Sequence, residues 1–209
     1  AVGCTVVAKP APETPYSATA MAYLSELAGI PKGVFNVVTG DAEKIGSVMT
    51  THKEVKKITF TGSTAVGKQL LKQSADTVKK VSLELGGHAP FIVFEDANLE
   101  DAVDGALIAK YRNSGQTCVC ANRIYVQSSI YDDFSKRFTE KASQLVVGDG
   151  LAESTQQGPL ISKDAMKKAS KHVEDAKNKG ATIATGGNPH SLGGLFFEPT
   201  VLTGVSDEM

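Results

Sequence analysis

The sequence lacks an excess of charge of either sign and any long apolar run. Its 209 residues hold 22 lysines and arginines against 23 aspartates and glutamates, so the formal net charge is −1. Such a chain has no overall field that attracts nucleic acid or an anionic membrane surface. No apolar stretch reaches the length that spans a bilayer. We therefore expect neither a nucleic acid nor a membrane as partner.

Cysteines are also few, and their spacing is uneven. Cys4 stands alone, whereas Cys118 and Cys120 are separated by one residue. Secreted disulfide scaffolds carry an even, dispersed set instead. The four histidines show no ligand spacing. We expect a reducing compartment and no metal site.

Most of the chain alternates short β-branched segments with amphipathic ones. Strands are predicted at residues 5–8, 34–38, 57–61, 78–85, 90–94, 123–127, 181–185 and near 196–202. Helices are predicted from Pro15 with Thr14 as cap, at 41–50 and 63–74, after caps at Asn98 and Ser162, and around the apolar face of residues 131–145. Such alternation indicates an α/β fold with a mainly parallel sheet covered by helices. The double glycine near position 87 predicts a boundary between units 1–86 and 87–209.

The stretch of residues 111–120 combines thiols with a fixed positive charge. Arg112 precedes a run of small and polar residues that ends in Cys118 and Cys120. A nearby cation or helix N-terminus favours the thiolate, which is the reactive form of cysteine. Taken alone, the stretch is equally consistent with half a metal site, a redox pair or two packed core thiols.

A glycine-rich segment, residues 60–68, follows one predicted strand and opens a helix. Gly62, Ser63 and Gly67 let backbone N–H groups approach a phosphate, which indicates a nucleotide site. Gly62, Gly67 and Lys68 also have the spacing of a P-loop, but Gln69 replaces the Ser or Thr that binds magnesium. An NTPase, or a helix start that binds nothing, are the alternatives.

Glu84 is a carboxylate inside the otherwise apolar predicted strand 78–85. One interpretation is an outward-facing acid on a half-exposed strand. The other is a desolvated base, since burial raises the pKa of a carboxylate toward the operating pH.

Three motifs in this order, FTGSTAVG, LELGG and YRNSGQTCVCANR, resemble the signature segments of the aldehyde dehydrogenase superfamily. The likeness extends to GVFNVVTG, TQQGPLIS and FFEPTVL, and RNSGQTCVCANR is similar to the succinate-semialdehyde dehydrogenase branch. The resemblance implies a parallel-sheet Rossmann-like NAD(P)-binding unit in residues 1–86, followed by an α/β catalytic domain in residues 87–209.

The resemblance also implies roles for single residues. Cys118 is the nucleophile, Glu84 the base, and Lys9 the contact to the adenosine ribose, while Gly62, Ser63 and Gly67 form the cofactor loop. The thiolate attacks the aldehyde, hydride passes to the nicotinamide, and water activated by Glu84 hydrolyses the thioester. The cofactor that the resemblance implies is NAD. NADP is also possible, because Pro12 stands where an acid would contact the ribose hydroxyls.

Arg112 matches an arginine that this branch uses for the substrate's distal carboxylate, for which its planar fork is suited. Its alternative role is a surface ion pair. Cys120 is either a packed small residue or a partner that captures Cys118 in a reducible disulfide.

The activity that the resemblance implies is oxidation of succinate semialdehyde to succinate in 4-aminobutyrate degradation. The whole protein is expected to be a homo-oligomer, a dimer or tetramer, in the mitochondrial matrix of a eukaryote or in bacterial cytoplasm. An upstream asparagine, a second arginine and a downstream acid of the family have no counterpart here, so we expect a piece of a longer polypeptide, inactive alone. Another semialdehyde acid as substrate, and a non-catalytic nucleotide-binding or redox-sensing fragment, are the alternative functions.

Overall fold

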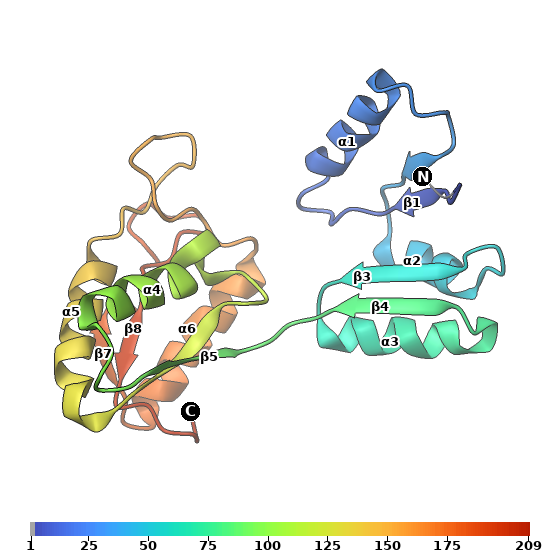
Figure 1. Ribbon diagram of the computed structural model, residues 1–209. Coiled ribbons are helices and arrows are strands. Elements are labelled where there is room, and N and C mark those ends of the chain that lie inside the picture. Colours follow the sequence, from blue (N-terminus) through green and yellow to red (C-terminus); the bar gives the residue numbers. More distant parts are fainter. Residues whose placement is uncertain (1–2) are drawn as a thin grey trace. The chain divides into compact units, whose positions relative to one another are not determined.

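The computed structural model describes residues 3–209, which divide between Leu85 and Gly86 into two compact units (Figure 1). The boundary lies one residue from the predicted one. The first unit contains β1 (Val6–Ala8), α1 (Tyr16–Leu27), β2 (Phe35–Val37), α2 (Ala42–Thr51), β3 (Lys57–Thr61), α3 (Thr64–Ser74) and β4 (Lys80–Glu84). The second contains β5 (Ala89–Val93), α4 (Leu99–Tyr111), β6 (Ala121–Val126), α5 (Tyr131–Ser143), α6 (Lys163–Asn178), β7 (Thr182–Thr185) and β8 (Val201–Thr203).

Two parallel strand pairs build the sheets of the first unit. β1 pairs with β2, and β3 pairs with β4 over five residues from Lys57↔Lys80 to Thr61↔Glu84. Asp41 and Ser63 cap α2 and α3, because their side-chain oxygens accept hydrogen bonds from first-turn N–H groups. The predicted order of strand, helix and strand is confirmed in this unit.

Two boundaries of the first unit differ from the prediction. Pro15, not Thr14, is the N-cap of α1, and it makes no side-chain cap hydrogen bond. The N–H of Thr14 instead closes a turn onto the carbonyl of Ala11. β4 begins at Lys80 rather than at residue 78, because Val78 is left-handed with φ 48° and ends a short 3-10 turn.

Helix α1 buries none of its residues within the described part of the chain. Its large apolar side chains stay open, with exposed fractions of 61% for Met21, 59% for Leu24 and 65% for Leu27. The apolar spacing of this segment correctly predicted a helix. Spacing predicts which residues share a face, but a face is buried only where another element packs on it.

The main core lies in the second unit, between the parallel pair of β5 and β6 and the helices α4 and α5. Val103 and Ala106 of α4 are fully buried, and Tyr111 is 6% exposed. The ring of Phe138 on α5 stacks between those of Tyr111 and Phe134, with centroid separations of 6.1 and 5.7 Å. α4 therefore buries one face at these three positions. This packing fixes the C-terminal end of α4, directly before the segment that holds Cys118 and Cys120.

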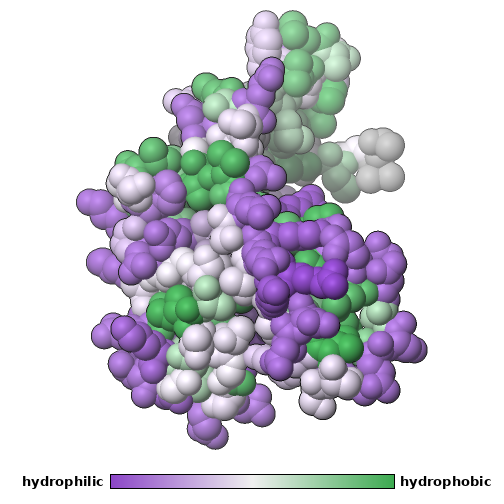
Figure 2. Space-filling view, turned by 90° about the vertical axis from the view of Figure 1, so that its left-hand side faces the viewer, coloured by the Kyte–Doolittle hydropathy of each residue, from purple (hydrophilic) through white to green (hydrophobic). Residues whose placement is uncertain are grey.

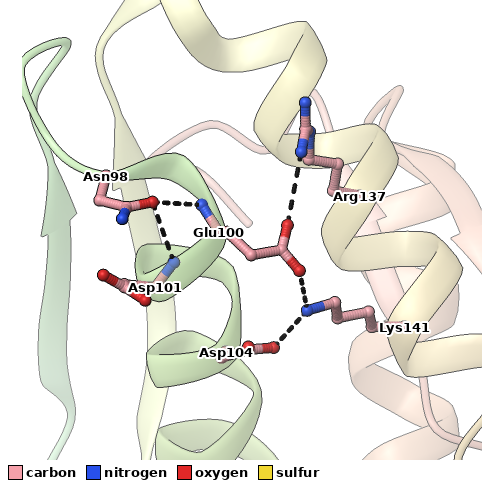
Figure 3. Close-up of polar contacts among 6 residues, drawn as sticks. All are labelled: Asn98, Glu100, Asp101, Asp104, Arg137 and Lys141. Atoms are coloured by element: carbon pink, nitrogen blue, oxygen red, sulfur yellow. Dashed lines mark hydrogen bonds and ion pairs between the residues drawn. The ribbon is translucent and has the colours of Figure 1, made fainter.

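Charged side chains join α4 to α5 on the outside of this core (Figure 3). Glu100 and Asp104 on α4 both accept from Lys141 on α5, and Arg137 reaches Glu100 at 3.4 Å. The hydrogen bond and charge of Lys141 lower the pKa of Glu100, and the two carboxylates raise the pKa of Lys141. Asn98 caps α4 as predicted, accepting from the N–H groups of Glu100 and Asp101.

The last strand pair departs from the predicted parallel order. β7 and β8 are antiparallel, whereas the other three pairs described are parallel. β8 also begins at Val201, later than the predicted residue 196. Phe197 instead forms an isolated bridge to Pro189, and Glu198 N–H donates to the carbonyl of Asn188. Residues 197–198 therefore close the glycine-rich turn at residues 186–194 before the chain enters β8.

The side of the molecule on which α5 lies is largely hydrophilic, with separate apolar patches between the polar side chains (Figure 2). Within residues 3–209, none of the helices has the length and apolar character needed to cross a membrane.

Candidate active site

The two cysteines of the motif lie in a turn that follows α4, which we call the cysteine turn (residues 112–120). Asn113 and Ser114 both have φ 54°, and Gly115 has φ 74°. Three successive left-handed residues reverse the chain directly after the helix. Left-handed backbone is uncommon for residues other than glycine, so this conformation depends on its surroundings.

Cys118 and Cys120 have opposite environments in this turn. The N–H of Cys120 donates to the carbonyl of Thr117 at 3.3 Å, which closes a β-turn with Cys118 near its tip. Cys118 is exposed, whereas Cys120 is only 1% exposed. The Cys120 thiol donates to the carbonyl of Lys110 at 3.3 Å, and Lys110 Nζ lies 3.6 Å from its sulfur. Both thiols are free, and of the two only Cys118 is exposed to solvent.

The Cys118 backbone N–H donates to no group within residues 3–209. A free N–H beside a nucleophile is a donor for the oxyanion that forms when a carbonyl is attacked. The backbone of Gly87 lies against the same turn, since a Cβ there would be 3.3 Å from the Cys118 carbonyl oxygen. The LELGG motif thus supplies the close approach for which a glycine is suited.

Arg112 is exposed and is the C-cap residue of α4, six positions before Cys118. Its guanidinium makes no hydrogen bond or ion pair with the residues that the structure describes. The alternative role in a surface ion pair therefore has no support in this part of the chain. An unpaired guanidinium fork is available for an external carboxylate.

Glu84 lies at the carboxyl end of β4, in the first unit. It pairs with Thr61, and its carbonyl accepts from the N–H of Gly62 at 3.0 Å. The structure therefore brings the predicted base beside the predicted cofactor loop, at the strand ends where α/β sheets bind ligands. Of the two interpretations left open by the sequence, the outward-facing acid is the one found. Glu84 is exposed because β4 alternates between the two faces and this residue lies on the open one.

The glycine-rich segment forms a tight strand-to-helix connection. A Cβ on Gly62 would lie 2.5 Å from the ring of Phe60, and one on Gly67 would lie 2.6 Å from Leu85. Ser63 caps α3 by accepting from the N–H of Val66 at 3.3 Å. A bare backbone at a helix N-terminus fits a phosphate of a dinucleotide. These residues therefore suit the cofactor that the sequence predicts.

Lys9 follows directly after β1, also at a carboxyl strand end. Its ammonium donates to the carbonyl of Pro10 at 2.6 Å. Lys9, Gly62, Ser63, Gly67 and Glu84 belong to the first unit, and Arg112, Cys118 and Cys120 to the second. Their individual roles stay predictions. No group of three or more metal-ligating side chains occurs between residues 3 and 209.

The sequence analysis gave no role to two glutamines, Gln116 within the cysteine turn and Gln157, which donates to the residue directly before it. Gln157 is only 6% exposed, and Gln116 links the turn to residues 159 and 161. For Gln157 the available signal was the segment TQQGPLIS, residues 155–162. This segment contributes to the family resemblance, but its composition alone indicates no role.

Comparisons with known proteins point to one enzyme family. The aldehyde dehydrogenase family model matches residues 1–209. Glutarate-semialdehyde dehydrogenase of Pseudomonas aeruginosa is 57% identical over 98% of the chain, which covers 42% of that relative. The NADP(+) succinate-semialdehyde dehydrogenase of Escherichia coli is 54% identical, again over 98% of the chain and 42% of the relative.

Among solved structures, the succinate-semialdehyde dehydrogenase from Burkholderia pseudomallei superimposes with a TM-score of 0.98. It is 56% identical, and the match covers 99% of this chain and 43% of that one. The chain thus spans less than half the length of the relatives that it matches.

Proposed function

Because this chain belongs to the aldehyde dehydrogenase family, we propose that the protein containing it oxidises a semialdehyde acid with NAD(P). Succinate semialdehyde is the substrate that we propose first, in 4-aminobutyrate degradation. Glutarate semialdehyde is the alternative, since one of the similar proteins bears that name. The two substrates differ by one methylene, and a pocket discriminates one methylene by only about 1–3 kcal/mol.

The observation that carries the proposal is the arrangement of the cysteine turn. It presents Cys118 at the tip of a β-turn with a free backbone N–H, and it begins with the unpaired guanidinium of Arg112. One short segment thus carries a nucleophile, an oxyanion donor and a guanidinium that can bind a carboxylate. This combination suits a substrate with an aldehyde at one end and a carboxylate at the other.

In the proposed reaction, the Cys118 thiolate forms a C–S bond to the aldehyde carbon. The carbonyl oxygen becomes an oxyanion and accepts from the Cys118 N–H, a type of contact that contributes roughly 3–4 kcal/mol in other enzymes. Bound nicotinamide would accept the hydride that leaves this carbon, so that the carbon remains on Cys118 as a thioester. Glu84 then takes a proton from the water that attacks the thioester, and the C–S bond breaks to release acid and thiolate.

Cofactor binding is proposed for the first unit. Gly62, Ser63 and Gly67 would hold the phosphates at the start of α3, and Lys9 would contact the adenosine ribose. The second unit would then be part of the catalytic domain. We also propose that the full-length protein is a homo-oligomer, which its mass in solution will test.

The proposal is tested with the full-length protein by following NAD(P)H formation. Succinate semialdehyde, glutarate semialdehyde and a neutral aldehyde should each be assayed with NAD and with NADP. Cys118→Ser should abolish turnover. Glu84→Gln should preserve the first burst of NAD(P)H and slow the later steady state, because acylation precedes hydrolysis. A protein that binds nucleotide but oxidises none of these aldehydes would favour a non-catalytic role.

A further inference from the structure

The cysteine turn is hydrogen-bonded to a second segment, residues 157–161, which we call the clamp. Asn113 and Ser114 occupy a backbone region that residues with a side chain rarely adopt. Such a conformation persists only where neighbouring groups overdetermine it. The clamp lies more than forty positions later in the sequence.

Gln157 makes the most buried of these contacts. Its side-chain Nε2 donates to the carbonyl of Tyr111 at 2.9 Å and to that of Gln156 at 2.8 Å. Tyr111 is the last residue of α4, and the final carbonyls of a helix have no partner within the helix. Both amide hydrogens of Gln157 are therefore used, and one of them satisfies the carbonyl directly before the cysteine turn.

Two further side chains join the turn to the clamp. Ser114 Oγ donates to the carbonyl of Gly158 at 3.0 Å. Gln116 Oε1 accepts from the N–H of Ile161 at 2.9 Å, and its Nε2 lies 3.4 Å from the carbonyl oxygen of Pro159. The contacts thus follow the same order along both segments, and on the cysteine side they all involve residues that precede Cys118.

The clamp is itself anchored to the rest of the second unit. Gln157 N–H donates to the carbonyl of Val146 at 3.0 Å, and its own carbonyl accepts from Gly148 at 3.0 Å. Leu160 N–H donates to the carbonyl of Leu195 at 2.8 Å. A segment fixed on both sides can impose a conformation on the turn that it contacts.

We propose that the clamp positions the cysteine turn, and that Gln157 and Gln116 are positioning residues for Cys118 and Arg112. This inference rests on the proposed function of those two residues. No side-chain contact holds Cys118 or Arg112 in place, since Cys118 is exposed and the Arg112 guanidinium is unpaired within residues 3–209. Their relative placement therefore depends on the backbone between them.

The test uses full-length Gln157→Met and Gln116→Met variants, which keep side-chain volume and remove the amide. Gln116→Glu is a graded variant, since it keeps the acceptor for the Ile161 N–H. Asn98→Ala is the matched control, because it removes a cap at the opposite end of the same helix.

The first readout is amide hydrogen exchange of the peptide that contains residues 112–118. Exchange there should become about tenfold faster in both Met variants, because a lost hydrogen bond lowers the cost of local opening. Gln116→Glu should lie between them and the wild type, and Asn98→Ala should match the wild type. Unchanged exchange in both Met variants would overturn the clamp without bearing on the proposed function.

The second readout is the split between kcat and KM. Misplacing the thiol should lower kcat by about 10- to 100-fold with any aldehyde. KM should rise only with the semialdehyde, because Arg112 contacts only its distal carboxylate. Faster exchange with wild-type kinetics would show a structural role alone and overturn the inference. A wild-type protein inactive with every aldehyde would overturn the proposed function, and with it the catalytic meaning of the clamp.

Discussion

Arg112→Ala in the full-length protein offers a sharp test of how the substrate is recognised. Arg112 is exposed at the end of α4, and its guanidinium has no partner within the part of the chain described here. Surface changes of this kind usually alter stability by less than about 0.5 kcal/mol. The variant should therefore fold normally, so that a change in its kinetics reports on the substrate.

The expected size follows from the hydrogen bonds that the guanidinium would make to a carboxylate. A hydrogen bond to a charged group contributes about 1.5–3 kcal/mol. Since 1.36 kcal/mol corresponds to a factor of ten, KM for succinate semialdehyde should rise by roughly 10- to 150-fold. Arg112→Lys should recover part of this loss, because an ammonium keeps the charge but not the planar fork.

The assay compares initial rates of NAD(P)H formation with succinate semialdehyde and with butanal, which has the same chain length but no carboxylate. KM for butanal should stay within about twofold of the wild-type value, since the removed contact is uniform binding that butanal never made. Arg137→Ala is the control, because it removes another exposed arginine, on α5. Equal increases in KM for both aldehydes would refute the assignment of Arg112.

Three further predictions concern the second unit. Tyr111→Phe should lower the stability of the second unit by about 1–3 kcal/mol in urea denaturation, because the buried phenol donates to the Thr200 carbonyl at 2.9 Å. Burial raises the pKa of this phenol well above its ordinary value, which keeps the donor protonated. Undiminished stability would argue against the hydrogen bond. Because the pKa of Glu100 is lowered in the folded state, its ion pair with Lys141 stabilises above the ordinary glutamate pKa, and this contribution is lost as pH falls through the lowered value. Glu100→Gln should therefore flatten the acid limb of the stability profile, and an unchanged limb would contradict the assignment. Finally, if Cys120 forms a disulfide with Cys118 under oxidation, peroxide should abolish activity and dithiothreitol should restore it. Cys120→Ala should lose this recovery. A Cys120→Ala variant that still recovers fully would exclude the disulfide.

Local sequence signals correctly predicted the elements that carry the candidate site. Asn98 and Ser162 were predicted as caps from their own chemistry, and both accept from N–H groups of the following turn. β3 was predicted at its observed bounds, and the helix after it begins directly behind Ser63. Such signals are readable because the partners lie within a few residues of one another.

The errors occurred where backbone conformation depends on distant partners. Residues 196–200 have the composition of a strand, but contacts to the glycine-rich turn delay β8 until Val201. The sequence left both burial and exposure open for Glu84, and the pleat places it on the open face. A strand pattern alternates between two faces without specifying which face is covered.

The cysteine turn shows the same division between sequence and structure. Motif order and residue chemistry were sufficient to select Cys118, Arg112 and Glu84 as candidates and to indicate the family. Only the tertiary structure separates an exposed Cys118 from a buried Cys120 two residues away, and only it reveals Gln157 under the turn. The physical reason is that burial and left-handed backbone are imposed by contacts across more than forty residues, which neither periodicity nor spacing encodes.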